Sequence, residues 1–236
     1  MKLQSKLNII VPCYNPIKNW EMDFSIKAIE LENLITDAQL TFILVNDGST
    51  INFDTTVAQS LRKSIQNIEI IHLENNMGKG AAIKNGIQLY TADYYIYYDI
   101  DFPFGLNCIS EIYKQLQLGN DIIVTNRGDE YLKLLPFKRR LLSKFIRILN
   151  MYYFSFKYYD TQSGLKGFNN NGKKVFEFIK SNSFVFDIEI MLFAKKMKLK
   201  ISEIHVSCNP SIHFSNFKKS VIFNELIQLF KILINR

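Results

Sequence analysis

Short apolar runs alternate along the chain with longer segments in which apolar residues recur every three or four positions. The short runs predict buried β-strands, and they occupy residues 7–11, 40–45, 68–73, 94–98, 121–125 and 201–207. The longer segments predict amphipathic helices at residues 24–36, 53–64, 81–91, 108–118 and 184–199. Strands that alternate with helices are typical of βαβ units. We therefore expect an α/β fold with a mixed, mainly parallel sheet flanked by helices.

The second half of the chain has a less regular pattern. An amphipathic stretch covers residues 138–156, a polar turn covers 160–167, and a last amphipathic helix is expected over 218–236. The sequence contains neither an internal repeat nor a low-complexity linker. We therefore expect a single domain over residues 1–236.

Composition supports a globular protein and narrows its partners. Of the 236 residues, 47% are hydrophobic and 14% are aromatic, which argues against a disordered chain. Three distant cysteines without metal-ligand spacing argue against a disulfide scaffold or a zinc site, and they fit a reducing cytosol. Neither a targeting segment nor a transmembrane run is found, so we expect a cytoplasmic protein. The net charge of +7 admits nucleic acid, an anionic membrane or a phosphorylated substrate as partner.

Two aspartates, Asp99 and Asp101, directly follow the apolar run at 94–98. At the end of a buried strand, two carboxylates repel each other and lose hydration. A divalent cation offsets both costs, because Mg²⁺ takes one or two carboxylates and completes its shell with phosphate oxygens and water. Ligands of parallel sheets bind beyond the carboxyl ends of the strands, which is where this pair is expected. The alternative reading is a solvated Asp-x-Asp turn.

A glycine-rich turn leads from the third predicted strand into a helix. Residues 75–82 read Asn-Asn-Met-Gly-Lys-Gly-Ala-Ala. Glycines permit close backbone approach, and the free amides of a helix start favour phosphate, with Lys79 adding positive charge. The spacing matches neither the Walker A loop nor the dinucleotide fingerprint. A flexible loop before a helix is the alternative.

Taken together, four motifs resemble the family 2 glycosyltransferases, which have the GT-A fold. These motifs are Ile10-Val11-Pro12-Cys13-Tyr14-Asn15, Val45-Asn46-Asp47-Gly48-Ser49, the glycine-rich turn, and Asp99-Ile100-Asp101. The second half looks like the dolichyl-phosphate glucosyltransferases and related polyprenyl-phosphate sugar transferases. The segments that carry this likeness are residues 160–168, 186–189 and 201–204. The resemblance covers about residues 8–206.

The resemblance implies an inverting glycosyltransferase that moves a sugar from a nucleotide sugar, with UDP-glucose expected, to a polyprenyl or dolichyl phosphate. It implies a donor-binding half at 1–126 and an acceptor-binding half at 127–236. The implied nucleoside pocket contains Pro12, Tyr14, Asn15 and Asp47, and the implied donor contacts are Gly78, Lys79 and Gly80. Asp99 and Asp101 would hold Mg²⁺ or Mn²⁺. The turn with Gln162, Ser163 and Gly164 would shape the acceptor side.

The chain departs from the family pattern at two places. The usual acidic pair before Gly-Ser is Asn46-Asp47 here, which puts one nucleoside contact in doubt. Residues 102–104 (Phe-Pro-Phe) replace the commoner polar residues after the metal motif, which leaves the donor and acceptor open. The C-terminal membrane helices and the N-terminal anchor of some relatives are also expected to be missing.

The acceptor decides whether a general base is needed. A polyprenyl phosphate is already ionised at neutral pH, whereas a sugar hydroxyl must lose a proton, with Asp187 or Glu189 as the candidate base. Either carboxylate can instead shape the pocket. A glycan hydroxyl in cell-surface polysaccharide synthesis is therefore the alternative acceptor.

Basic residues in the second half suit an acceptor phosphate and anionic head groups. Arg127 follows the strand at 121–125, and the stretch at 138–156 supplies Lys138, Arg139, Arg140 and Arg147. Its apolar residues Phe145, Ile146, Ile148 and Leu149 could pack against lipid. We expect peripheral contact with the inner face of a membrane, to which the helix at 218–236 could add. Solvated charges and core packing explain the two segments equally well.

Two other functions fit parts of the pattern. A sugar-nucleotide nucleotidyltransferase also needs a basic glycine-rich loop and a metal-binding aspartate. A non-catalytic membrane-surface or nucleic-acid module fits the charge. No nucleic-acid-binding signature is present, so we expect no nucleic-acid partner. The sequence leaves the oligomeric state open.

Overall fold

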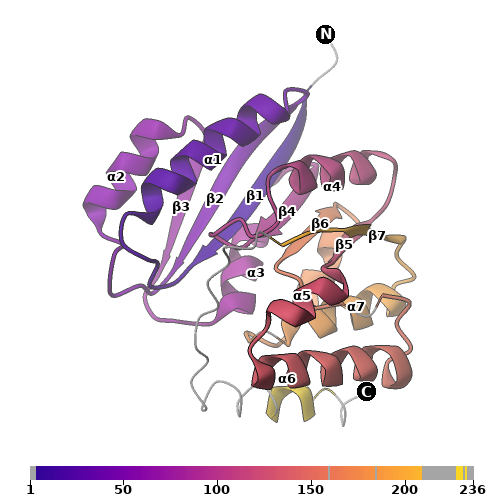
Figure 1. The fold of residues 1–236 in the computed structure, drawn as a ribbon. Helices are drawn as coiled ribbons and strands as arrows, with labels where there is room; N and C mark the ends of the chain where they lie inside the picture. Colours follow the sequence, from indigo (N-terminus) through magenta and orange to yellow (C-terminus); the bar gives the residue numbers. More distant parts are fainter. Residues whose placement is uncertain (1–3, 159, 184, 209–226, 231, 233–236) are drawn as a thin grey trace.

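The computed structural model describes residues 4–158, 160–183, 185–208, 227–230 and 232. Within these residues, seven strands form one sheet in the order β3-β2-β1-β4-β6-β5-β7 (Figure 1). The strands are β1 (Ser5–Cys13), β2 (Ala38–Asp47), β3 (Ile68–Leu73), β4 (Tyr94–Tyr98), β5 (Ile122–Asn126), β6 (Leu165–Asn169) and β7 (Ile201–His205). The six predicted strands are all present, with ends that differ by a few residues from those expected.

The predicted helices are also present within a few residues of their expected bounds. The α-helices are α1 (Trp20–Leu34), α2 (Thr55–Ser64), α3 (Lys79–Leu89), α4 (Asn107–Gln117), α5 (Gly128–Leu134), α6 (Phe137–Ile148) and α7 (Phe186–Lys196). A π-helical turn, Leu149–Tyr153, extends α6, and a 3₁₀ helix, Gly172–Glu177, follows β6. The helix expected at 218–236 lies mostly outside the described residues, which show helical backbone at 227–230 and 232.

Parallel pairing places most strand ends at one edge of the sheet. β1 pairs in parallel with β2 and β4, β2 with β3, and β5 with β7. β6 is antiparallel to both β4 and β5. The polar turn expected at 160–167 is therefore wrong in its second part, where the strand β6 begins.

Strand β6 was not predicted because its sequence breaks the apolar pattern with Lys166 and Gly167. Gly167 is required by packing, since a Cβ there would lie 2.2 Å from Cγ2 of Ile112 in α4. Lys166 is completely buried and has a charged partner, described below. Helix α5 was likewise not predicted, because its seven residues are too few to show a period.

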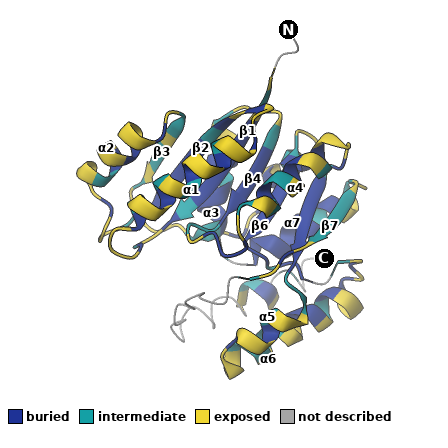
Figure 2. Cartoon of the chain, turned by 45° about the horizontal axis from the view of Figure 1, so that its top comes forward, coloured by how far each residue is buried: buried dark blue, intermediate teal, exposed yellow. Residues whose placement is uncertain are grey.

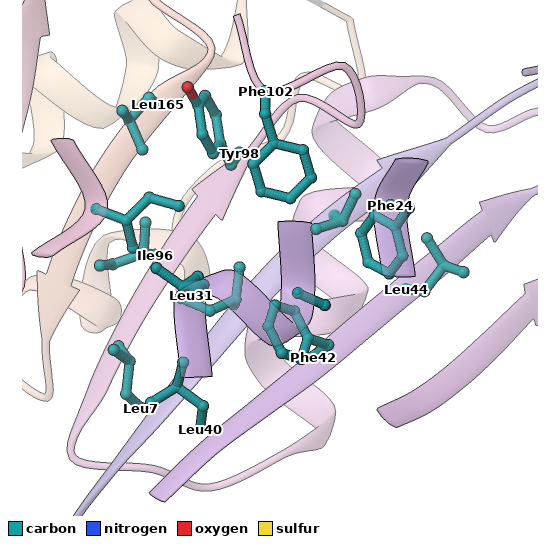
Figure 3. Close-up of a cluster of buried hydrophobic side chains, with 14 of the residues drawn as sticks. Leu7, Phe24, Leu31, Leu40, Phe42, Leu44, Ile96, Tyr98, Phe102 and Leu165 are labelled. Carbon is teal, nitrogen blue, oxygen red and sulfur yellow. The ribbon is translucent and has the colours of Figure 1, made fainter. Parts of the chain in front are cut away.

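The sheet has a hydrophobic core on each face. One core packs α1, α2 and α4 on the sheet, and its aromatic side chains include Phe24, Phe42 and Tyr98 (Figure 3). The other packs α3, α7 and the 3₁₀ helix, with Ile146 of α6 and Leu229 at its margin. The order of layers is therefore helices, sheet and helices, as expected for an α/β fold.

Among the described helices, none is both long enough and apolar enough to cross a bilayer.

Candidate active site

The carboxyl ends of β1, β2 and β4 meet at the point where the strand order reverses. From β1 the chain builds β2 and β3 on one side, and α3 then returns it to β4 on the other side (Figure 1). Open α/β sheets bind ligands in the crevice at such a switch point. Asn15, Asp47 and Asp99 lie in or just after these strand ends, so the sheet brings together residues from three separate motifs.

Asp47, at the end of β2, organises the glycine-rich turn. Its side chain is 3% exposed, and its two oxygens accept hydrogen bonds from the amides of Met77 at 2.7 Å and Gly78 at 2.9 Å. Two amides that could bind a phosphate are thereby bonded to a carboxylate of the protein. The predicted contact between Asp47 and a nucleoside stays a prediction, and the contacts seen are with this turn.

The glycines of the turn let it pack closely on the segment before α7. Gly78 has a φ of +98°, and a Cβ there would lie 2.4 Å from the carbonyl oxygen of Asn182. The amide of Gly80 donates to the same oxygen at 2.9 Å. The glycines thus permit close contact between the turn and the backbone of Asn182, and this contact lies within the protein. Lys79 is the residue of this turn whose charge reaches the acidic pair.

The loops after β1 and β2 are joined by Asn15. Its backbone is left-handed, with a φ of 46°, and its Oδ1 accepts the amide of Thr50 at 2.8 Å. Asn46 supports the same loop, because its Oδ1 accepts the amide of Ser49 at 3.0 Å. Pro12 is partly exposed, and Tyr14 presents an exposed ring at this edge.

The acidic pair after β4 is bonded to the glycine-rich turn and to Gly164, the residue before β6. Lys79 Nζ lies 2.5 Å from Oδ1 of Asp99, and the Asp99 amide donates to the carbonyl of Gly164 at 3.2 Å. A Cβ at Gly164 would lie 1.9 Å from Oδ2 of Asp99. Gly164 therefore leaves the space that the Asp99 carboxylate occupies.

Asp101 reaches solvent at the rim of the site. Burial by the surrounding protein raises the pKa of its carboxyl, and the neighbouring charge of Asp99 raises this pKa further. An ionised pair at this place is therefore costly without a cation. Lys27 Nζ approaches the backbone carbonyl of Asp101 at 3.3 Å, so a third charged group lies at the rim.

The unusual residues after the acidic pair form its support. Phe102 has a φ of 47°, is buried, and packs edge-on against Tyr98 with ring centroids 4.9 Å apart. The hydroxyl of Tyr98 accepts the amide of Phe104 at 2.6 Å. Residues 102–104 therefore fold back onto β4 and fix the turn that carries Asp101, which explains their apolar character.

The chemistry of the acidic pair fits a divalent cation. Within the described part of the chain, no group of three or more His, Cys, Asp and Glu side chains is arranged to hold a metal. Among the described residues, this site offers the two carboxylates of Asp99 and Asp101, which is the donor number Mg²⁺ usually takes when phosphate and water complete its shell. The ammonium of Lys79 already occupies a cation position against Asp99.

A buried charge pair lies beneath the acidic pair. Lys166 Nζ is 2.6 Å from Oδ1 of Asp187, which also accepts the hydroxyl of Tyr97 at 2.5 Å. All three side chains are almost completely buried. Burial lowers the pKa of the Lys166 ammonium, although Asp187 opposes that effect. Lys166 and Tyr97 were not predicted as site residues from the sequence. Lys166 could have been noticed, because a lysine within an apolar segment is buried only when it has a charged partner.

Glu189 holds the segment that packs on the glycine-rich turn. Its Oε2 accepts the amides of Ser181 at 2.8 Å and Lys180 at 3.2 Å. Burial raises the pKa of its carboxyl. Both candidate bases, Asp187 and Glu189, are therefore buried and already engaged with protein groups.

A second charge cluster lies at the end of β5. Arg127 binds Asp160 through two side-chain bonds, with Nε to Oδ2 at 3.0 Å and Nη2 to Oδ1 at 2.6 Å. Arg147 from α6 approaches Oδ2 of Asp160 at 3.4 Å and Oδ1 of Asp129 at 3.1 Å. Burial alone would raise the pKa of Asp160, but Arg127 and then Arg147 lower it below its ordinary value. This cluster connects β5, α5 and α6 to the turn before β6.

Asp160→Ala is expected to lower the free energy of unfolding by about 3–5 kcal/mol, because it leaves two buried guanidinium groups without their common partner. Urea unfolding at neutral pH measures this change. The wild-type pKa of Asp160 is depressed, so its stabilisation is complete above an unfolded-state pKa of about 3.9 and is lost as pH falls below it. A loss under 1 kcal/mol, or an unchanged acid limb of stability, would contradict this assignment.

The remaining predicted residues have different surroundings. Arg140 donates to the carbonyls of Lys133 at 3.0 Å and Leu135 at 3.1 Å, so it caps the end of α5. Arg139 is partly exposed, and burial lowers its pKa. Gln162 is partly exposed beside Gly164, whereas Ser163 is buried and accepts the hydroxyl of Thr125 at 2.5 Å.

Known sequences resemble this chain over most of its length. The family described as glycosyl transferase family 2 matches residues 8–178. A dolichyl-phosphate beta-glucosyltransferase of Trichomonas vaginalis is 30% identical, over 99% of this chain and 74% of that protein. The dolichyl-phosphate beta-glucosyltransferase of Dictyostelium discoideum is 28% identical, over 85% of this chain and 65% of that protein. The chain thus spans about two thirds to three quarters of the length of these relatives.

Solved structures share the fold at much lower identity. Glucosyl-3-phosphoglycerate synthase of Mycobacterium tuberculosis, crystallised with Mn²⁺, UDP-glucose and phosphoglyceric acid, superposes with a TM-score of 0.66 at 11% identity, covering 99% of this chain and 80% of that one. Its complex with Mn²⁺, UDP and glucosyl-3-phosphoglycerate gives a TM-score of 0.62 at 14% identity, covering 99% and 78%. The expected GT-A fold is confirmed. With the family match over residues 8–178, the chain belongs to glycosyl transferase family 2 and is a glycosyltransferase.

Proposed function

We propose that this glycosyltransferase moves glucose from UDP-glucose to a polyprenyl or dolichyl phosphate with inversion at the anomeric carbon. The observation that carries the proposal is the acidic pair Asp99 and Asp101, placed at the switch point of the sheet and bonded to a lysine of the glycine-rich turn. The named activity of the relatives from Trichomonas vaginalis and Dictyostelium discoideum supports the choice of sugar and acceptor.

Residues 1–126 form the proposed donor half. Tyr14 and Asn15 would line the nucleoside pocket, and Asp47 fixes the turn that presents Lys79. Asp99 and Asp101 would hold Mg²⁺ or Mn²⁺, which when bound neutralises the charge that develops on the departing diphosphate. Lys79 adds a positive charge on the same side. These groups orient the donor and stabilise its leaving group.

Residues 127–236 form the proposed acceptor half. In its buried cluster, Arg127 and Arg147 share Asp160, and Arg147 also contacts Asp129 at the surface. Arg139 lies partly exposed nearby on α6 and is the guanidinium we assign to the acceptor phosphate. The carbonyl of Gly164 accepts the amide of Asp99 at 3.2 Å, so the turn that carries Gln162 joins the proposed acceptor half to the acidic pair.

The buried carboxylates fit a phosphate acceptor better than a hydroxyl acceptor. Asp187 is bonded to Tyr97 and Lys166, and Glu189 is bonded to backbone amides. We assign both as positioning residues. An ionised phosphate attacks without a general base, whereas a glycan hydroxyl would require one within reach.

A product assay with defined acceptors tests this proposal. Purified protein is incubated with Mn²⁺, radiolabelled UDP-glucose and either dolichyl phosphate in detergent or a soluble glucan, and organic-phase counts are compared with labelled glucan. Label in the organic phase that is released by mild acid supports a glucosyl phospholipid. Transfer to the glucan alone would favour the glycan-hydroxyl alternative, and pyrophosphate release from glucose 1-phosphate and UTP would favour a nucleotidyltransferase.

We also propose that α6 contacts the inner face of a membrane peripherally. Phe137 is 76% exposed and Leu141 is 62% exposed, and Phe145 and Ile148 continue at helical spacing and are also exposed. Figure 2 shows exposed positions along α6. Lys138 and other exposed lysines lie beside these side chains. Apolar residues flanked by cations suit an anionic lipid interface.

The structure changes which residues of 138–156 could meet lipid. Phe145 and Ile148 are exposed as expected, but Ile146 is buried and Leu149 packs against the core. Arg147 points inward to Asp160 instead of toward a head group. The part of the 218–236 helix that is described includes Leu229, which is buried in the core.

Leu141→Gln combined with Phe145→Gln is expected to weaken binding to vesicles of anionic phospholipid about tenfold, because two side chains lose burial in the interface. Cosedimentation measures the partition coefficient. The matched control is Met22→Gln with Ile26→Gln on α1, which removes similarly exposed apolar side chains elsewhere. Equal vesicle binding by both double variants would contradict the assignment of α6.

A further inference from the structure

Lys79 occupies the position of a cation in the candidate active site. Its Nζ lies 2.5 Å from Oδ1 of Asp99, and its side chain is only 15% exposed. At this distance the ammonium of Lys79 and the carboxylate of Asp99 form an ion pair. Asp99 therefore already has a counter-ion before any ligand arrives.

The charges around Lys79 do not balance. In the described residues, Asp99, Asp101 and Asp187 face the ammonium groups of Lys79 and Lys166, which leaves one negative charge. Lys27 at the rim does not change this sum, because it is paired with its own aspartate, Asp23, at 2.7 Å. Two further positive charges would make the site net positive, which is the sign that attracts a diphosphate.

Asp99 cannot keep Lys79 at this distance from Oδ1 and accept a divalent cation on the same oxygen without bringing two cations into contact. Carboxylate oxygens approach Mg²⁺ at about 2.0–2.1 Å. An ammonium within 3 Å of the same oxygen would then lie close to the ion, and the two cations would repel each other strongly at low effective dielectric. Lys79 has a flexible stem of four methylene groups, so it can move while the backbone of the glycine-rich turn stays fixed by Asp47.

We propose that Lys79 is an exchangeable counter-ion, which leaves Asp99 when the divalent ion binds and pairs with the donor diphosphate. This inference depends on the proposed function in one respect, because the diphosphate that Lys79 binds is that of the proposed donor. It makes Lys79 a competitor of the metal in the empty site and a ligand of the nucleotide in the loaded site. Metal and nucleoside diphosphate must then bind cooperatively, and the coupling must act equally in both directions.

Calorimetric titration of Mn²⁺ into nucleotide-free protein gives the first test. Lys79→Met removes the ammonium and keeps the length of the side chain, and it is expected to tighten Mn²⁺ binding about tenfold, within the usual range of coupling between sites. Lys79→Arg keeps the charge and is expected to bind Mn²⁺ within about threefold of the wild type. Lys63→Met, at an exposed position on α2, is the control for a loss of one positive charge and is expected to have no effect.

The second arm repeats the titrations with saturating UDP or GDP. In the wild type, a nucleotide that binds is expected to raise the affinity for Mn²⁺ about tenfold or more. In Lys79→Met, the nucleotide is expected to raise the affinity for Mn²⁺ by less than half of the wild-type factor. Nucleotide binding itself is expected to weaken in Lys79→Met while Mn²⁺ alone binds better. A purely structural role for Lys79 would weaken both.

Opposite changes in the two affinities support the exchange. Mn²⁺ affinity that is unchanged or weaker in Lys79→Met overturns it, as does the absence of measurable Mn²⁺ binding in either protein. If Mn²⁺ alone binds tighter in Lys79→Met but no nucleotide binds the wild type, the proposed donor fails and the competition of Lys79 with the metal stands.

Discussion

Asp101→Ala is expected to reduce glycosyl transfer about 10³-fold or more, with no loss of stability. One of the two carboxylates for the divalent ion is removed, and metal stabilisation of a leaving diphosphate contributes several kcal/mol to the transition state. Burial and the charge of Asp99 both raise the pKa of the Asp101 carboxyl, so the folded protein destabilises the ionised form of Asp101. Removing it should therefore leave the melting temperature unchanged or slightly raised.

Initial rates over a range of Mn²⁺ concentrations, with thermal unfolding in parallel, check both parts of this expectation. Glu30→Ala, at an exposed position on α1, is the matched control for the loss of one negative charge and should retain wild-type activity. Asp101→Ala protein that keeps more than about a tenth of wild-type activity would show that the pair does not hold the catalytic metal.

Gly164→Ala is expected to reduce activity about 10²-fold, because the added methyl group takes the space of the Asp99 carboxylate. The new Cβ would lie 1.9 Å from Oδ2 and 2.5 Å from Cγ of Asp99. The backbone of Asp99 is fixed to the carbonyl of Gly164, so the carboxylate is the part that moves. Misplacement of a catalytic group by about 1 Å is enough for a loss of this size.

A double-mutant cycle with Asp99→Ala tests whether Gly164 acts through Asp99. In the Asp99→Ala background the methyl group fits into vacated space, so Gly164→Ala should cost less than about threefold in further activity. The Mn²⁺ concentration for half-maximal rate should rise in the single variant Gly164→Ala. Losses that multiply in the double variant would mean that Gly164 has another role, for example toward the acceptor.

The regular part of the fold was predictable because apolar periodicity records burial directly. Six strands and the helices of the first half follow from that pattern, and the pattern also places Asp99 and Asp101 at a strand end. Strand β6 was not predictable in the same way. Its buried Lys166 depends on Asp187, 21 residues further along the chain, and Gly167 depends on Ile112 of α4.

The orientation of α6 shows a limit of periodicity. A period of 3.6 residues indicates that a helix has two unlike faces, and the usual inference is that the apolar face is inside. In α6, Arg147 is buried against Asp160, while Phe137 and Leu141 face outward. Ile146 still packs into the core, so periodicity located one buried face. It did not indicate that Arg147 would be buried, which the contact with Asp160 in the turn before β6 explains.

The glycine-rich turn shows the corresponding limit for site prediction. Its composition suggested free amides for a phosphate, but Asp47 and the carbonyl of Asn182 bind the amides of Gly78 and Gly80. The contact between Lys79 and Asp99 has no signature in the sequence, since it joins two motifs 20 positions apart. Motif order thus indicated the candidate site, and the contacts within it required the structure.

The most direct test of the proposed chemistry is calorimetric binding of UDP-glucose, UDP-galactose, UDP-N-acetylglucosamine and GDP-mannose, with and without Mn²⁺, to the wild type and to Asp101→Ala. We predict that UDP-glucose binds only with Mn²⁺ and that this binding is lost in Asp101→Ala. Donor binding that depends on neither Mn²⁺ nor Asp101 would contradict a metal-dependent nucleotide-sugar site at the end of β4, and so would the failure of all four donors to bind.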